Sequence, residues 1–244
     1  MSKGQAERGS QRDIQWLFNE PKNRILLESR LGIKIANDGW LSPVHDEEYR
    51  EYQDKGFMRK IGLSTYSNEL VGKFWPKRGP VWDGLAKSSD GTILLFEAKA
   101  HISELFGGGM KAKSKDSCAL IRKSLSETAK YIGACYDAVS WTDTMYQTAN
   151  RLAHLYFLNK ILKEKIGVKA KLVYLVFLND ESVLSCKETE EMWNTAIDVA
   201  ERCILKLPFD KTRFNDGSEG SWRDWVSHVF IDFKDIKCPD FTSI

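Results

Sequence analysis

The sequence predicts an α/β protein in which helices flank a mixed central β-sheet on both faces. Apolar runs of strand length alternate along the chain with amphipathic segments of helical spacing. Two of these runs are joined by an Asp-Gly pair at residues 90–91, which is typical of a β-hairpin. Several runs are apolar on both faces, so helices must cover both sides of the sheet.

The first third of the chain is predicted to be mainly helical. Residues 1–10 are polar, and we expect them to be a disordered tail, with residues 11–244 forming a single domain because no linker divides them. Helical spacing, Pro21 and the terminating glycines predict helices over residues 11–19, 21–31 and 47–61. A strand is predicted over residues 70–75, and the hairpin follows it.

The hairpin carries an unusual set of polar residues. Folding back at residues 90–91 places Asp83 opposite Glu97, within one residue. Side chains on the second strand alternate between faces, so Glu97, Lys99 and His101 share one face. Buried carboxylates and ammonium groups need an ionic partner or a metal. A simple ion pair between Glu97 and Lys99 at a solvated strand end is the structural alternative.

The second half of the chain is predicted to alternate helices with two strands. The expected helices cover residues 119–138, 140–162 and 188–207, and the expected strands cover residues 170–178 and 228–233. A glycine-rich, cationic loop over residues 106–116 follows the hairpin. Its lysines, Lys111 and Lys113, are candidates for substrate contact, and we expect the loop to be a flexible lid.

The predicted helix over residues 140–162 carries a polar stripe. On a helical wheel four polar side chains fall on one line: Gln147, Asn150, Arg151 and His154. Most of the remaining surface of this helix is apolar, so the stripe needs polar partners. It faces either the cleft that contains Glu97, where its four side chains would bind substrate, or the solvent on an outer helix.

Composition constrains the partners and the compartment. A net charge of +2 neither suggests nor excludes nucleic acid. Five scattered cysteines without a Cys-x-x-Cys pattern indicate reduced thiols, mostly in the core, and no zinc site. No apolar run reaches the ~20 residues of a membrane span, and no signal peptide begins the chain. We therefore expect a cytoplasmic protein with no membrane partner.

Asp83, followed on the next strand by Glu97-x-Lys99, resembles the signature of the PD-(D/E)XK nuclease superfamily. The segments FWPKRGPVWDGLA and EAKAH are similar to an uncharacterised branch of that superfamily. Trp82 precedes Asp83, so the nominal Pro-Asp pair is absent. The resemblance implies a restriction-endonuclease-like core with additions at both ends.

The resemblance also implies a metal-dependent endonuclease that hydrolyses phosphodiester bonds of DNA, with RNA as a further substrate class. Asp83, Glu97 and the carbonyl of Ala98 are expected to hold Mg²⁺ or Mn²⁺, and Lys99 to orient the attacking water. An upstream glutamate often completes such sites, and the candidates are Glu28 and Glu69. His101 is expected to contact a phosphate. Homodimers are frequent in this fold.

One feature of the stripe also has a counterpart in the superfamily. Some members carry a glutamine with an aromatic partner on the helix after Glu-x-Lys. Gln147 matches this position loosely, and Arg151 stands where the aromatic residue would be.

Two other functions are compatible with the same residues. A nuclease-fold protein could bind nucleic acid or a protein partner without cutting it, although intact Asp83, Glu97 and Lys99 favour an active site. A phosphodiesterase for a non-nucleic substrate is the second alternative, because the net charge is modest.

Overall fold

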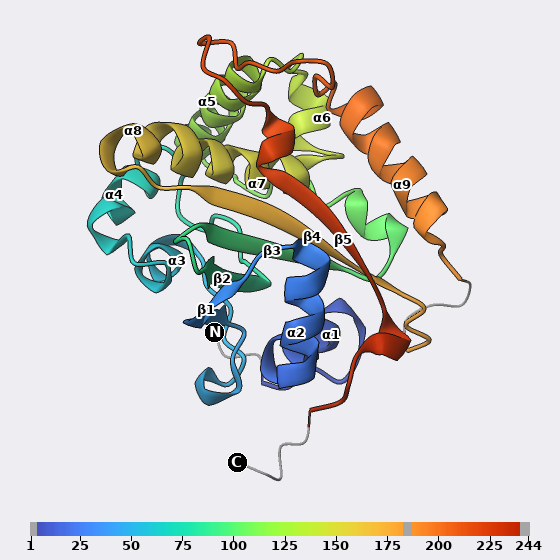
Figure 1. Cartoon of the computed structure of the whole chain (residues 1–244). Coiled ribbons are helices and arrows are strands. Elements are labelled where there is room, and N and C mark those ends of the chain that lie inside the picture. The colour runs from blue at the N-terminus through green and yellow to red at the C-terminus, as the bar shows by residue number, and fades with distance from the viewer. Residues whose placement is uncertain (1–3, 183–186, 240–244) are drawn as a thin grey trace.

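Five strands form one mixed sheet in the computed structural model, which describes residues 4–182 and 187–239 (Figure 1). The strands lie in the order β1 (Ile35–Ser42), β2 (Gly84–Ser88), β3 (Ile93–Lys99), β4 (Ala170–Leu178) and β5 (Val226–Asp232). β2 is antiparallel to both of its neighbours, β1 and β3, whereas β3, β4 and β5 are parallel. The predicted mixed α/β sheet is therefore confirmed.

Helices cover both faces of the sheet, as predicted. Figure 1 shows α1 (Gly9–Asn19) and α2 (Pro21–Leu31) on one face, with α5 (Lys115–Ile132) and α7 (Tyr146–Tyr156) on the other. On the first face Phe18 packs edge-on against Phe96 at 5.1 Å. On the second face, residues of α5 and α7 bury the opposite side of β3, including Leu95. The alternation of side chains along β3 thus divides the core into two layers.

The remaining helices are short and connect these layers. They are α3 (Asp54–Lys60), α4 (Ser67–Leu70), α6 (Ala138–Thr142), α8 (Lys163–Ile166) and α9 (Glu190–Asp198). Turns of π-helix continue α7 into α8 and extend α9. The single helix predicted over residues 140–162 begins instead as α6, and the chain turns at residues 143–145 before α7 starts.

The hairpin has the predicted register. Gly84 lies opposite Phe96, and the backbone N–H of Ala98 donates to Asp83 Oδ2 at 2.9 Å. Gly91 in the turn has a φ of 85°, which glycine adopts without strain. All seven residues of β3 are buried, so its polar end lies inside the protein.

Four features of the first 75 residues differ from the predictions. Of the helix expected over residues 47–61, only Asp54–Lys60 is α-helical, as α3. Residues 4–10 are not a free tail: α1 begins at Gly9, and the N–H of Ala6 donates to the side chain of Gln15. β1 was not expected because Asn37-Asp38-Gly39 interrupts its apolar pattern. The strand predicted over residues 70–75 is absent from the described chain, where α4 ends at Leu70 and only an isolated bridge follows.

Four cysteines lie in the described chain as free thiols: Cys118, Cys135, Cys203 and Cys238. Three of them are exposed, which corrects the expectation that most are in the core, and Cys186 lies outside the described residues. Among the residues that the structure describes, no helix is both long and apolar enough to cross a membrane.

Candidate functional site

Five polar side chains meet at the carboxyl end of β3, and we call them the cavity cluster: Asp83, Glu97, Lys99, Gln147 and Arg151. Glu97 is at their centre. Its Oε1 accepts hydrogen bonds from Lys99 Nζ at 2.6 Å and Gln147 Nε2 at 2.7 Å. Its Oε2 accepts from Arg151 Nε at 2.8 Å. The polar stripe therefore faces Glu97, and the solvent-facing alternative is wrong for Gln147 and Arg151.

Secondary structure explains why these side chains meet. Alternation along β3 directs Glu97 and Lys99 to the face covered by α7, and Gln147 and Arg151 are one helical turn apart on α7. Lys99 Nζ also donates to Gln147 Oε1 at 3.0 Å, so three side-chain hydrogen bonds join the strand to the helix.

Arg151 is held on every side. Its NH1 donates to Asn150 Oδ1 at 2.9 Å, and its NH2 donates to the carbonyl of Val81 at 2.9 Å. The guanidinium lies 4.9 Å from the centre of the Trp82 ring, a cation–π contact. Fixed in this way, Arg151 provides a positioned positive charge next to Glu97.

The two carboxylates of the cluster have opposite pKa shifts. Burial, together with the nearby charge of Glu97, raises the pKa of Asp83 to about 7. Burial alone would also raise the pKa of Glu97, but Arg151 and Lys99 hold it below its usual value. Glu97 is thus ionised at neutral pH, whereas Asp83 exchanges a proton near pH 7.

The cluster fits a divalent cation through Asp83 more readily than through Glu97. Among the described residues, the N–H of Ala98 is the only hydrogen-bond donor to Asp83, which leaves its other carboxylate oxygen available. Both oxygens of Glu97 are occupied by donors. Within residues 4–182 and 187–239, no group of three or more His, Cys, Asp or Glu is arranged to hold a metal. Two carboxylates and a backbone carbonyl are the available hard-oxygen donors.

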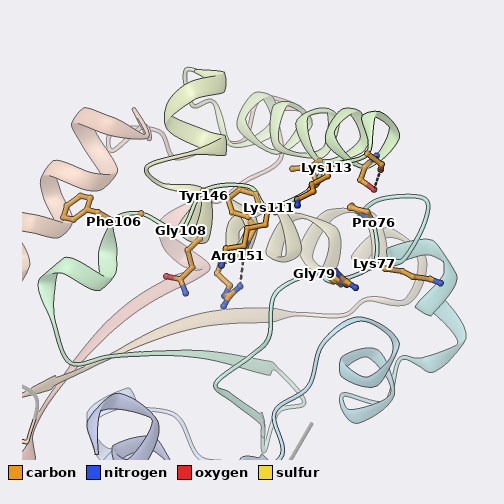
Figure 2. A pocket seen from close by; sticks show the side chains of 18 of the residues that line it. Pro76, Lys77, Gly79, Phe106, Gly108, Lys111, Lys113, Tyr146 and Arg151 are labelled. Carbon is orange, nitrogen blue, oxygen red and sulfur yellow. Dashed lines mark hydrogen bonds between the residues drawn. The ribbon is translucent and has the colours of Figure 1, made fainter. Parts of the chain in front are cut away.

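A cavity of about 1130 Å³ opens directly above the cluster (Figure 2). Lys99, Gln147 and Arg151 form part of its lining, whereas Glu97 lies beneath them with an exposed fraction of 1%. One lining residue is acidic, Glu104, and six are basic: Lys77, Arg78, Lys99, Lys111, Lys113 and Arg151. The cavity is therefore suited to an anionic ligand.

The two walls of the cavity are fixed to the protein body. On one side, the carboxylate of Asp54 accepts hydrogen bonds from the backbone N–H groups of Arg78 and Gly79, both at 2.8 Å. On the other side, the N–H groups of Gly107 and Met110 donate at 2.8 Å to backbone carbonyls in residues 142–144. The glycine-rich loop, which we expected to be a flexible lid, is therefore anchored at two points.

The other predicted contact residues have different environments. Lys111 and Lys113 are exposed, and both line the cavity with Asn150. His101, in contrast, lies beside Glu188 Oε1, with its Nδ1 at 3.4 Å, and does not line the cavity.

His154 is not a substrate contact, contrary to the prediction. It is 2% exposed and packs edge-on against Trp75 and Trp82, while its Nδ1 bonds to the carbonyl of Asn150 at 2.8 Å. Burial lowers its pKa to about 3, so the imidazole is neutral. Its place on the polar stripe reflects packing against aromatic residues from a distant part of the sequence.

Neither upstream glutamate belongs to the cluster. Glu28 accepts hydrogen bonds from Lys34 Nζ and from the N–H of Ile35. Ile35 pairs with Ser88, at the turn end of the hairpin, which is the end away from Glu97. Glu69 pairs on the surface with Lys165, ahead of the first residue of β4. The prediction that Glu28 or Glu69 completes the site is therefore wrong.

Tyr146 lines the cavity and was not predicted (Figure 2). It lies four residues before Asn150, so it occupies the same side of α7 as the polar stripe. Extending the stripe by one turn toward the amino end would have identified it.

Comparison of the chain with protein-family models, with curated proteins and with solved structures finds no match.

Proposed function

We propose that this protein is a metal-dependent endonuclease that hydrolyses phosphodiester bonds of DNA. One observation carries the proposal: Asp83, Glu97 and Lys99 lie together at a buried strand end, directly beneath a strongly basic cavity. Burying four ionised or ionisable side chains at one point is unfavourable for folding, which supports a chemical role. The resemblance to the PD-(D/E)XK superfamily suggests the reaction.

Each side chain of the cavity cluster would have a distinct role in this reaction. Lys99 and Arg151 would bind the scissile phosphate and stabilise the negative charge that develops on it. Glu97 keeps both cations in place, and Gln147 fixes the direction of Lys99 Nζ. Asp83, with Glu97 and the carbonyl of Ala98, would hold Mg²⁺ or Mn²⁺, which when bound supplies charge neutralisation and a more acidic water.

A second candidate function is binding of nucleic acid without cleavage. This function is supported by the hydrogen bonds of Glu97, because its two carboxylate oxygens already accept three hydrogen bonds from protein donors. Two carboxylates are matched by two cations, so the cluster is neutral overall without a metal when both acids are ionised.

A cleavage assay separates the two functions. Duplex, single-stranded and branched DNA, and RNA, are incubated with the protein and Mg²⁺ or Mn²⁺. We expect cleavage that requires the ion and falls by about 100-fold or more in Lys99→Met, because the positioned ammonium is lost while the aliphatic stem is retained. Lys87→Met is the matched control, since Lys87 is an exposed lysine on the neighbouring strand.

Thermal melting of each variant verifies that the fold is intact. Cleavage that persists undiminished in folded Lys99→Met would remove Lys99 from the mechanism. Binding of nucleic acid with no cleavage of any substrate would establish the second candidate instead.

A further inference from the structure

The reacting groups lie too deep for a duplex to reach them easily. The side chains of Lys99 and Arg151 are each 6% exposed, and Glu97 lies below both. The two anchored walls stand above these residues, one formed by residues 76–79 and the other by residues 106–114. A phosphate must therefore pass between two fixed segments before it meets Lys99.

The volume of the cavity limits the size of the nucleic-acid segment that it can hold. A B-form duplex is roughly 20 Å across with a rise of about 3.4 Å, so each base pair occupies on the order of 1,000 Å³. The cavity, at about 1130 Å³, therefore accommodates about one base pair. Since one nucleotide takes about half of a base pair's volume, about two nucleotides of a single strand fit in the same space.

Positive charge lies along both walls. Lys77 is on one wall, and Lys111 and Lys113 are on the other (Figure 2). Arg78 follows Lys77 in the sequence and also lines the cavity. The capped amino end of α5, at Ser114, adds the partial positive charge of a helix terminus to the second wall. A strand lying between the walls would place its phosphates next to cations on either side.

Tyr146 lines the same cavity as Lys111 and Lys113 (Figure 2). An aromatic ring in a basic groove is the usual platform for an unpaired base, and stacking of this kind tolerates any base. A paired base has both faces covered by its neighbours and gains nothing from such a ring.

We propose that the cavity binds a single-stranded polynucleotide, and that the single strand is the substrate of the proposed nuclease. The second half of this statement rests on the proposed function. The first half does not, since binding is measurable without metal or cleavage.

Binding is tested by fluorescence anisotropy in the presence of EDTA, with a labelled DNA strand of about 20 nucleotides and the same sequence as a blunt duplex. We expect the single strand to bind about tenfold more tightly or better. Lys111→Ala/Lys113→Ala should weaken single-strand binding on the order of tenfold at 0.1 M salt and reduce the salt slope by about 1.4, which corresponds to two lost phosphate contacts.

Matched controls isolate each contribution. Lys22→Ala/Lys237→Ala removes two exposed lysines elsewhere on the surface and should leave affinity unchanged. Tyr146→Phe keeps the ring and should bind as the unmodified protein does, whereas Tyr146→Leu should lose about fivefold to tenfold or more. A single-stranded RNA arm distinguishes recognition of the shared phosphate backbone from recognition of deoxyribose.

The outcomes separate the two proposals. Duplex binding as tight as single-strand binding, or equal losses in the Lys111/Lys113 and control variants, overturns the inference. Tight single-strand binding with no cleavage under any metal supports the inference and rejects the proposed nuclease. Cleavage of duplex in preference to single strands rejects the inference and leaves the nuclease in place.

Discussion

Two buried clusters of acidic residues in the described part of the chain differ in what surrounds them. The N-terminal cluster consists of Arg12, Asp13 and Asp180, and lies where α1 meets the end of β4. Arg12 NH2 contacts Asp13 Oδ1 at 2.6 Å and Asp180 Oδ1 at 2.9 Å. Both carboxylates are 0% exposed. In the cavity cluster, by contrast, the cations themselves line an open cavity.

A raised pKa does not distinguish the two clusters. Burial raises the pKa of Asp13 to about 7, as it does for Asp83. The N-terminal cluster has one cation for two acids, and Arg12 lies against the rings of Trp16 and Phe233. A buried acid with a raised pKa is therefore not enough to identify a functional site. Cations accessible from a cavity are the informative feature.

The largest expected difference is in catalysis. Asp83→Asn keeps an acceptor for the N–H of Ala98 but removes a carboxylate, so the cleavage rate should fall about 1000-fold, equivalent to about 4 kcal/mol. Asp13→Asn is the same substitution at an acid with a similar pKa. The cleavage rate of this variant should stay within about twofold of the rate of the unmodified protein. Initial cleavage rates of both variants, measured at a saturating metal concentration, test this prediction. An equal loss in both variants would contradict the comparison.

A smaller difference is expected in stability. Arg12→Met leaves two buried acids facing each other and should lower the free energy of unfolding by about 3 kcal/mol. Arg151→Met should cost about half as much, because Glu97 still has Lys99 and Gln147. Urea denaturation of both variants measures the two values. A greater loss in Arg151→Met would show that Lys99 and Gln147 do not compensate.

The smallest effect is a dependence of stability on pH. Asp13 has an unfolded pKa near 3.8 and a folded pKa of about 7, so the folded state binds the extra proton between these values. Its contribution to stability is complete below about pH 4 and is lost as the pH rises through 7. Asp13→Asn should therefore gain stability relative to the unmodified protein as the pH rises from 4 to 8. Urea midpoints across this range measure the gain, and parallel curves would exclude it.

Local patterns predicted the parts of the fold that depend on neighbouring residues. The Asp-Gly turn determines the pairing of the hairpin, and the nearly continuous apolar run from Ala170 to Leu178 is β4 from its first residue to its last. Helical spacing correctly grouped Gln147 with Arg151, because the unpredicted turn at residues 143–145 lies before both.

Other features depend on contacts between distant segments. His154 shares the stripe with Arg151, yet Trp75 and Trp82 cover it. Whether Glu28 reaches the site depends on which end of the sheet α2 approaches, and sequence spacing does not reveal that. β1 is an irregular edge strand with two register shifts, so its pattern is not that of a regular strand.

The contact between Arg12 and Asp180 also has a consequence for synthesis of the chain. α1 leaves the ribosome well before its partners on β4, because about 150 residues separate the two elements. At ordinary rates of translation this stretch takes roughly ten to thirty seconds. During that interval the apolar face of Ile14, Leu17 and Phe18 lacks its final cover. Nascent chains of this protein should therefore depend on chaperones that bind exposed apolar helix faces.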